Sequence, residues 1–262
     1  MMLCLDIGNS HIFGGVFAGD ELRMTFRQSS KSGASSDEHG LFFRSVLREN
    51  GVEPASIERI AMCSVVPEIV YTISASCRKY FDIAPFILQA GVRTGLKIAY
   101  QNPLEVGADR IANAIAATHM YPDQDLLIID MGTATTLCAI GRGRLYKGGV
   151  ILPGLRMSMQ ALYSGASKLS AVEIVRVDTA LGRTTATSIQ SGLFYGHLGA
   201  LQTIIGRVVD EEFDGKRPLV LATGGFASLY EDSALFDQLV PDLVLQGLRL
   251  AQVMNEDGLT RV

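Results

Sequence analysis

Apolar residues gather in short runs in the first half of the chain, and polar or glycine-containing turns separate these runs. Such runs are typical of strands, whereas apolar residues recurring every three or four positions are typical of helices. Gly19-Asp20 predicts a tight turn that joins two strands as a hairpin. By these criteria the first half contains predicted strands at Met2–Leu5, Ile12–Phe17, Leu22–Arg27, Ile57–Ser64 and Pro85–Leu88, and predicted helices at Asp37–Glu49, Glu68–Tyr80 and Val106–His119.

The second half repeats this order of elements. Tyr121-Pro122-Asp123 interrupts the helical pattern, and three apolar runs follow it, just as three such runs open the chain. The predicted strands are Leu126–Ile129, Thr136–Gly141, Arg144–Ile151 and Leu219–Ala222, and the predicted helices are Leu155–Tyr163, Ser188–Phe213 and further helices toward the C-terminus.

The repeated order of elements predicts the fold class. Three antiparallel strands followed by alternating helices and strands, present twice, indicate an α/β protein with two ribonuclease-H-like domains, each in the order βββαβαβα. We expect these domains to span residues 1–121 and 122–262, with the active-site cleft between them.

Composition and charge narrow the classes of partner. The chain has 262 residues, 48% of them hydrophobic, and a net charge of −4, without a block of basic residues. A nucleic-acid or anionic-membrane partner therefore has little electrostatic support, and no apolar stretch approaches the length of a membrane span. The four cysteines lack the C-x-x-C spacing of metal or redox sites and predict buried free thiols in a cytoplasmic protein.

Two copies of one short pattern carry the candidate chemistry. Asp6-x-Gly8-Asn9-Ser10 and Asp130-x-Gly132-Thr133 each follow an apolar run and precede another, so each predicts a strand, a tight turn and a second strand. A carboxylate at a strand end can hold a hydrated cation, and turn N–H groups with Asn, Ser or Thr side chains can bind phosphate oxygens. The pair predicts a nucleotide site. Thr223-Gly224-Gly225, after a further strand, is a candidate nucleoside edge or only a strand–helix turn.

A third motif, Gly107-Ala108-Asp109-Arg110, opens the helix near the domain junction. Phosphorylation of an alcohol needs a group that orients the hydroxyl and accepts its proton, and a carboxylate can do both. The adjacent arginine offers a planar fork suited to an anionic group. A solvated helix N-terminus, where acidic residues are favoured in any case, is the alternative interpretation. The chain contains neither a G-x-x-x-x-G-K-[ST] loop nor a G-x-G-x-x-G fingerprint.

The order of these motifs resembles that of a known family. The two hairpins and the glycine turn together are similar to the superfamily of acetate and sugar kinases, Hsp70 and actin. With Cys63-Ser-Val-Val-Pro67, Gly107–Arg110 and Gly148-Gly-Val-Ile-Leu-Pro-Gly154 in their places, the chain resembles type III pantothenate kinase nearly end to end. The resemblance implies ATP-dependent phosphorylation of pantothenate to 4'-phosphopantothenate, the first step toward coenzyme A.

The resemblance also implies roles for individual residues. Asp109 matches the catalytic carboxylate, Asp6 would lie near magnesium, and Asp130 matches the ligand of a monovalent cation, potassium or ammonium. Thr184-Thr185 stands where the family usually has Asn-Thr, and Ser10 stands where threonine is commoner. The implied substrate contacts are Tyr100, Gly107, Ala108, Asp109, Arg110 and Thr185, and the implied ATP contacts are Asp6, Ile7, Gly8, Asn9, Ser10, His11, Ile12, Phe13 and Thr133.

The exact function and the neighbour of one long helix stay open at the level of sequence. A kinase for another small hydroxylated substrate and a non-catalytic nucleotide-binding regulator of the same fold are the rival functions. The long predicted helix Ser188–Phe213 carries apolar residues together with Gly192, Gly196 and Gly199. These glycines predict close approach of a neighbouring helix, either from a second subunit of a homodimer, as in the family, or from the same subunit.

Overall fold

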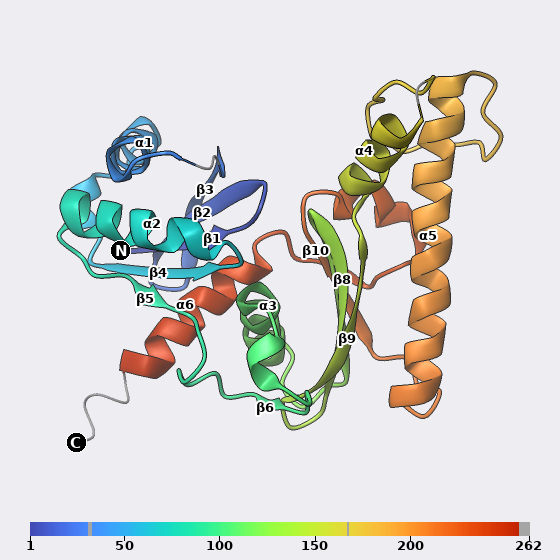
Figure 1. The fold of residues 1–262 in the computed structure, drawn as a ribbon. Coiled ribbons are helices and arrows are strands. Elements are labelled where there is room, and N and C mark those ends of the chain that lie inside the picture. Colours follow the sequence, from blue (N-terminus) through green and yellow to red (C-terminus); the bar gives the residue numbers. More distant parts are fainter. Residues whose placement is uncertain (31–32, 167, 257–262) are drawn as a thin grey trace. The chain divides into compact units, whose positions relative to one another are not determined.

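The computed structural model describes residues 1–30, 33–166 and 168–256, which form two compact units (Figure 1). The first unit contains Met1–Gly95, Asn102–Ala116 and the described residues from Leu243 onward. The second unit contains Leu96–Gln101 and Ala117–Asp242. The chain therefore crosses from one unit to the other at several points.

The first unit is built on a five-stranded sheet with helices on both faces. Its elements are β1 (Met2–Ile7), β2 (His11–Ala18), β3 (Glu21–Ser29), α1 (Ser36–Glu49), η1 (Pro54–Ser56), β4 (Arg59–Ser64), α2 (Pro67–Phe81), β5 (Phe86–Ile87), η2 (Pro103–Glu105), α3 (Ala108–Met120, of which the last turn belongs to the second unit) and α6 (Leu243–Glu256). The strand order is β3-β2-β1-β4-β5, in which β2 is antiparallel to β1 and β3, and β4 is parallel to β1 and β5. In Figure 1, α1 and α2 cover one face of this sheet and α6 covers the other.

Alternation along β1 explains how both faces are used. Successive residues of a strand point to opposite faces. Leu3, Leu5 and Ile7 belong to a buried cluster with residues of α1 and α2, such as Phe43 and Ile73. The intervening residues of β1 therefore point to the face that α6 covers. Five of the six residues of β1 are buried, and the sixth, Asp6, is half-buried.

Local signals fix where the first helices begin. The hydroxyl of Ser35 accepts a hydrogen bond from the backbone N–H of Glu38, and the Glu38 carboxylate accepts one from the backbone N–H of Ser35. This reciprocal cap satisfies two N–H groups that the first turn of α1 would otherwise leave unpaired. Pro67 is the first residue of α2, where its fixed φ fits and its missing N–H costs nothing.

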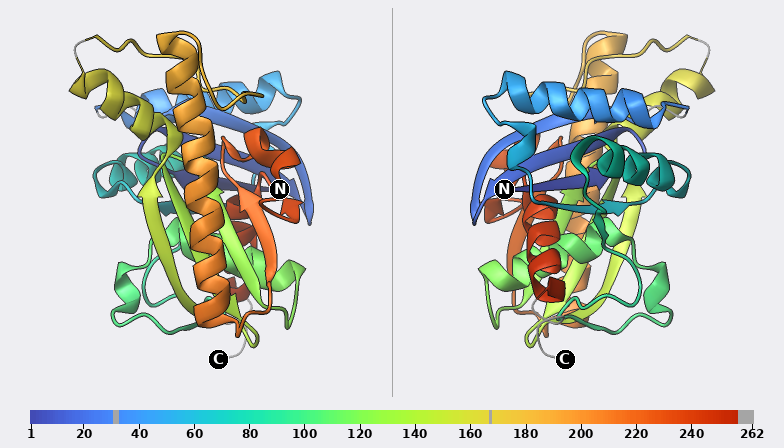
Figure 2. Two further views of the ribbon diagram at one scale, coloured as in Figure 1. Left: turned by 90° about the vertical axis from the view of Figure 1, so that its right-hand side faces the viewer. Right: turned by 90° about the vertical axis from the view of Figure 1, so that its left-hand side faces the viewer.

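The second unit repeats the same sheet. Its elements are β6 (Lys97–Ile98), β7 (Leu126–Met131), β8 (Ala134–Gly141), β9 (Leu145–Pro153), α4 (Leu155–Gly165), α5 (Thr185–Glu212), β10 (Leu219–Thr223), η3 (Ala227–Ser233) and β11 (Gln238–Leu239). The strand order is β11-β10-β7-β8-β9-β6. The long helix α5 runs along one face of this sheet (Figure 2), where Leu193 and Leu201 join a buried cluster with Leu127 and Ile129.

The two sheets confirm the predicted fold class. In each, three antiparallel strands come first, and the first of the three then pairs with a parallel strand from later in the chain. Removal of the edge strand β6 leaves the orders β3-β2-β1-β4-β5 and β9-β8-β7-β10-β11, which are equivalent position by position. The chain is thus a duplicated ribonuclease-H-like α/β protein.

The units differ from the expected division at residue 121, because Leu96–Gln101 belongs to the second unit and α6 belongs to the first. The first boundary lies near the expected one, but α6 belongs to the first unit rather than to a domain of residues 122–262. The reason is packing: a side chain on Gly15 of β2 would meet Leu245 of α6, and one on Gly247 would meet the backbone of Ala112 in α3. These close approaches hold α6 against the first unit.

Two further predictions can be compared with the structure. All four cysteines are buried free thiols, as the sequence predicts. The sequence does not predict strand β6, because two residues are too few to show a period. Within the part of the chain that the structure describes, no helix is both long and apolar enough to span a membrane.

Candidate active site

The first hairpin closes tightly after β1. The N–H of Gly8 donates to the carbonyl of His11 at 3.0 Å, which sets the turn Gly8-Asn9-Ser10 between the two strands. Ser30 braces this turn from outside, because its hydroxyl donates to the carbonyl of Gly8 at 2.7 Å. Asn9 at the tip is exposed. The predicted strand, tight turn and strand are therefore confirmed, and the tip presents the polar groups expected to bind phosphate.

One row of residues crosses the first sheet beside this turn. Asp6 of β1 is aligned with Phe13 of β2 on one side and with Cys63 of β4 on the other, and Phe13 is aligned with Arg27 of β3. Directly paired residues point to the same face of a sheet. The row Arg27–Phe13–Asp6–Cys63 therefore lies on the face that α6 covers, at the end of the sheet where the hairpin turns.

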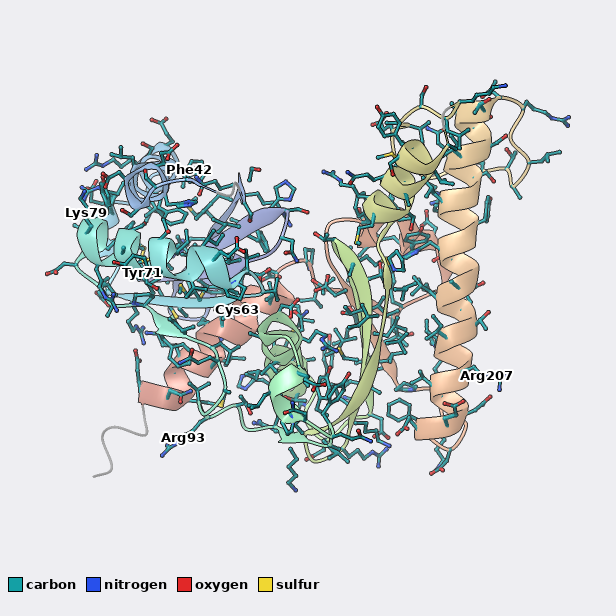
Figure 3. The ribbon with its side chains drawn as sticks, in the orientation of Figure 1. Phe42, Cys63, Tyr71, Lys79, Arg93 and Arg207 are labelled. Carbon is teal, nitrogen blue, oxygen red and sulfur yellow. The ribbon has the colours of Figure 1, made fainter. Side chains whose placement is uncertain are left out.

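Cys63 of β4, labelled in Figure 3, provides a contact to the carboxylate in this row. Its Sγ donates a hydrogen bond to Oδ1 of Asp6 over 3.3 Å. Burial, followed by the charges of Asp6 and Asp109, raises the pKa of the Cys63 thiol well above its usual range. The thiol is consequently protonated near neutral pH and acts as a donor.

Asp109 is held by the start of its own helix. It belongs to the first turn of α3, and its Oδ1 accepts the backbone N–H of Arg110 at 2.8 Å. Gly107 makes room for the carboxylate, because a Cβ at that position would lie only 2.5 Å from Oδ1 of Asp109. The Asp109 side chain is half-buried. The first unit thus contains Asp6 with its hairpin, Cys63 and Asp109.

Arg110 is buried, unlike the solvated helix N-terminus of the alternative interpretation. The residue is 6% exposed. One guanidinium nitrogen, Nη2, lies 3.5 Å from the carbonyl oxygen of Glu105. Its guanidinium, through this contact with Glu105, is placed to hold the Gly107–Asp109 segment in position. The motif alone gave no sign of this burial, because an arginine in the first turn of a helix is usually solvated.

The second hairpin repeats the first in the second unit. Asp130 is the last residue but one of β7 and is half-buried, and the N–H of Gly132 donates to the carbonyl of Ala134 at 3.1 Å to close the turn. The glycine turn after β10 lies against this carboxylate. Gly224 has a φ of +91°, and a Cβ there would lie 2.6 Å from Oδ1 of Asp130 and equally close to the backbone of Met131. Only glycine fits this left-handed, crowded position.

Asp6 and Asp130 are suited to hard cations that keep most of their other ligands, not to a metal site built from protein side chains alone. Among the described residues no group of three or more His, Cys, Asp or Glu side chains is placed to hold a metal ion. Magnesium typically keeps several waters and is bound through one or two carboxylates together with substrate phosphates. Asp6 therefore fits magnesium that arrives with a nucleotide. Asp130 is half-buried beside the Gly224 turn and offers one carboxylate to a cation.

The second hairpin is tied to the long helix by a contact that sequence analysis missed. Thr135, two residues after Thr133, is buried, and its Oγ1 lies 3.1 Å from Nε2 of His197 on α5. Burial lowers the pKa of His197, so its ring is neutral and can share one hydrogen bond with the hydroxyl. No spacing rule predicts this pair, because its members are 62 residues apart in the chain. Thr133 itself is exposed at the tip of the turn.

The two remaining substrate candidates also lie in the second unit. Tyr100 is half-buried, with its ring centroid 6.2 Å from that of the fully buried Tyr146 in an edge-on arrangement. The hydroxyl of Tyr146 donates to Sγ of Cys138 at 3.1 Å, and this hydrogen bond holds the ring of Tyr146 in place beside Tyr100. Thr185 is the first residue of α5 and is exposed. The cap of α5 is Thr184 rather than Thr185, so Thr185 has no capping role.

Comparisons with known proteins agree with this arrangement. A family model described as type III pantothenate kinase matches residues 2–207. A type III pantothenate kinase of Legionella pneumophila (strain Corby) is 58% identical over 255 residues, which cover 97% of this chain and 99% of the relative. Among solved structures, a Baf family protein from Campylobacter jejuni, described as a transcriptional activator, has a TM-score of 0.62 at 18% identity and covers 97% of this chain and 99% of its own.

A second solved structure extends the likeness in fold. The ROK hexokinase of Thermus thermophilus has a TM-score of 0.54 at 15% identity, covering 98% of this chain and 99% of its own. At such identity the likeness concerns the fold alone, and it agrees with the duplicated sheet described above. Sequence identity over nearly the whole chain is far more specific. The chain belongs to the type III pantothenate kinase family.

Proposed function

We propose that the protein is an ATP-dependent kinase that phosphorylates the primary hydroxyl of pantothenate to give 4'-phosphopantothenate and ADP, the first step of coenzyme A synthesis. Membership of the family over nearly the full chain carries this proposal. The geometry of the first unit supports it, because the carboxylate of Asp109 is fixed at the start of α3 by the N–H of Arg110 and by the space that Gly107 leaves. The rival functions, a different kinase or a non-catalytic regulator, gain no support of this kind.

Asp109 is the proposed catalytic residue. Its carboxylate accepts a hydrogen bond from the pantothenate hydroxyl and takes the proton as the hydroxyl oxygen attacks the γ-phosphorus. The bond from that phosphorus to the bridging β-oxygen breaks in the same step, and ADP departs with the bonding electrons. One Asp109 oxygen accepts the backbone N–H of Arg110, which fixes the orientation of the carboxylate. The hydroxyl thus meets a carboxylate whose rotamer is already set.

Phosphate binding is assigned to the two hairpins, each within its own unit. In the first, Asp6–Phe13 supplies turn N–H groups and the side chains of Asn9 and Ser10. In the second, Thr133 supplies an exposed hydroxyl at the tip. Such donors are worth most when they are held in place before the phosphate arrives. Ser30 and Ala134 provide this fixation through their hydrogen bonds to the turns.

Cations are assigned to two carboxylates. Magnesium bound with ATP, and a monovalent cation such as potassium or ammonium, would supply positive charge that offsets the charge of the phosphates. Asp6 would hold the magnesium through its water shell. Asp130 would hold the monovalent cation beside the Gly224 turn, where the close backbone leaves no room for a side chain.

Pantothenate contacts are assigned to Tyr100, Gly107–Arg110 and Thr185. Tyr100 offers an aromatic face supported by Tyr146. The backbone of Gly107 and Ala108 lies exposed enough to reach a ligand, since both residues are half-buried. The exposed hydroxyl of Thr185 is available for a hydrogen bond. Together these contacts would bind pantothenate and place its primary hydroxyl for reaction.

A homodimer through α5 is the proposed assembly, with Thr185 close to a site formed partly by the second subunit. Four glycines interrupt this helix, and a methyl group added to any of them would meet no other atom within 4 Å. Each interior glycine costs about 1 kcal/mol relative to alanine. Among residues 1–30, 33–166 and 168–256 no close neighbour offsets this cost, whereas a second copy of α5 would. The four are Gly192, Gly196, Gly199 and Gly206.

A cytoplasmic location is proposed from the cysteines, since all four are buried free thiols and such thiols are typical of reducing compartments.

The function itself is tested by the rate of ADP release with pantothenate against a panel of other hydroxy acids and sugars. Pantothenate should give the highest kcat/KM by a wide margin. A better substrate elsewhere in the panel would replace pantothenate in the proposal.

A further inference from the structure

We propose that Arg27 is an additional nucleotide-binding residue and that its guanidinium binds a phosphate group of ATP. This inference rests on the proposed function, since it assigns a further contact to the same site. It begins from the row that crosses the first sheet. Arg27 is aligned with Phe13, and Phe13 is aligned with Asp6, so one arginine and one carboxylate flank an aromatic residue of the first hairpin.

The guanidinium of Arg27 is held over the ring of Phe13. Its Cζ lies 4.1 Å from the ring centroid, within the range of a cation–π contact. Arginine loses much rotamer freedom when it is bound, and a contact that already restricts the side chain reduces that loss. The face of the guanidinium is used in this stacking. Its N–H groups lie in the plane of the group, and they remain directed outward for hydrogen bonds.

The charge of Arg27 has no acidic partner among the described residues. Within residues 1–30, 33–166 and 168–256 no carboxylate lies within ion-pair distance of its guanidinium, although the residue is exposed. Arg23, on the same strand, behaves differently, because its Nη2 lies 3.1 Å from the carboxylate of Glu21. Arg27 is thus a restrained cation that is left for an external anion.

A phosphate group fits this position better than the carboxylate of pantothenate. Phe13 belongs to the hairpin whose turn, Gly8-Asn9-Ser10, is the proposed phosphate binder, and Arg27 is tied to that hairpin by both pairing and stacking. A guanidinium fork matches two phosphate oxygens with two parallel hydrogen bonds. It would also offset the negative charges that the phosphates add beside Asp6.

The test measures ligand affinity in the complete protein. Arg27→Met keeps the aliphatic stem but removes the charge, Arg27→Lys keeps the charge but removes the planar fork, and Arg23→Met is the matched control on the same strand. Titration calorimetry of each variant with a non-hydrolysable ATP analogue, ADP, AMP and pantothenate, all with magnesium, gives the dissociation constants. Circular dichroism and the unfolding temperature show that each variant is folded.

We expect Arg27→Met to bind the ATP analogue about ten- to a hundredfold more weakly, as the loss of a charged hydrogen bond predicts. Arg27→Lys should lose less, and Arg23→Met should match the native protein. Pantothenate affinity should be unchanged throughout. Unchanged affinity for the ATP analogue in Arg27→Met, or a loss confined to pantothenate, would overturn the proposal.

The measurement separates this inference from the proposed function. If the native protein turns over pantothenate while Arg27→Met binds nucleotide normally, the inference fails and the function stands. If the native protein does not phosphorylate pantothenate but nucleotide binding depends on Arg27, the inference stands and the function fails. Phe13→Leu provides a further check, because removal of the ring should weaken nucleotide binding less in an Arg27→Met background than in the native one.

Discussion

The thiol of Cys63 donates a hydrogen bond to the carboxylate of Asp6 across two parallel strands, with 3.3 Å between Sγ and Oδ1. The thiol is buried and neutral, because burial and neighbouring carboxylates raise its pKa well above its usual range. A neutral donor restrains the carboxylate without cancelling its charge. Cys63 thus orients the residue proposed to hold the magnesium of MgATP.

Replacement of Cys63 tests this relationship. Cys63→Ala removes the donor, so the KM for MgATP should rise about threefold to tenfold, the range that a net hydrogen-bond contribution predicts. Cys63→Ser keeps a hydroxyl donor and should restore most of the loss. Cys77→Ala is the control, because Cys77 is equally buried but lies in α2, away from Asp6. Equal effects of the alanine substitutions at the two cysteines would indicate a packing effect only.

Replacement of Asp109 tests the proposed chemistry. Asp109→Asn has nearly the same shape, so the fold and nucleotide affinity should persist. Turnover should fall by about a hundredfold or more, which is the usual contribution of a positioned acid–base group. Asp123→Asn is a matched control, since Asp123 is exposed with a φ of +54° that asparagine also tolerates. Near-normal turnover of Asp109→Asn would remove this residue from the mechanism.

Replacement of Asp130 tests the monovalent cation. The native enzyme should be clearly more active in potassium or ammonium than in sodium or a bulky organic cation, because a cation site of fixed geometry favours ions of one size. Asp130→Asn should lower activity in potassium and reduce this difference between salts. Steady-state rates at constant ionic strength provide the comparison. Identical rates of the native enzyme in all four salts would mean that no such site exists.

Two buried histidines predict a loss of stability in acid. Burial lowers the pKa of His197 and of His39, so in the folded state both hold their neutral form below the ordinary value of 6.5. Above 6.5 neither state of the protein gains a proton at these rings. As pH falls below 6.5, the unfolded chain binds protons that the folded chain does not, and folding stability decreases until the lowered pKa values are passed.

Urea unfolding between about pH 7.5 and about pH 5 measures this dependence. His197→Gln keeps an acceptor for the hydroxyl of Thr135 but cannot be protonated, so its stability should decrease less over this range. His119→Gln is the control, because His119 is exposed. Parallel curves for the native protein and His197→Gln would show that His197 does not contribute.

A change on the open face of α5 tests the proposed dimer. Gly196→Lys introduces a long charged side chain where the monomer leaves open space, so the monomer should fold normally. The dimer should dissociate and lose activity. Sedimentation of the native protein and of this variant provides the comparison. Ser45→Lys is the control, because Ser45 is an exposed residue of α1. A fully active native monomer at micromolar concentration would refute both the dimer and the shared site.

Local patterns predicted the parts of the site that depend on a few neighbouring residues. Asp6-x-Gly8 and Asp130-x-Gly132 specify their turns within a handful of positions, and both hairpins form as expected. Gly107–Arg110 likewise opens a helix, although the burial of Arg110 depends on packing around that helix. Hydrophobic periodicity and turn residues therefore sufficed for the order of the main elements.

Other contacts arise between segments that no local pattern relates. Cys63 reaches Asp6 through the register of two parallel strands, and Thr135 reaches His197 across 62 residues of chain. The pairing of α6 with the first unit depends on glycines such as Gly247 that admit a close backbone. These relationships follow from register and shape complementarity, which a single sequence does not display.

Identification of the reaction product is the most direct test of the proposed function. The native enzyme is incubated with MgATP and pantothenate, and phosphorus NMR and mass spectrometry follow the products. We expect ADP and one phosphate monoester on the primary hydroxyl of pantothenate, in equal amounts, with the ester nearly absent for Asp109→Asn. Release of inorganic phosphate with ADP and no ester, or an ester formed equally fast by Asp109→Asn, would contradict the proposed mechanism.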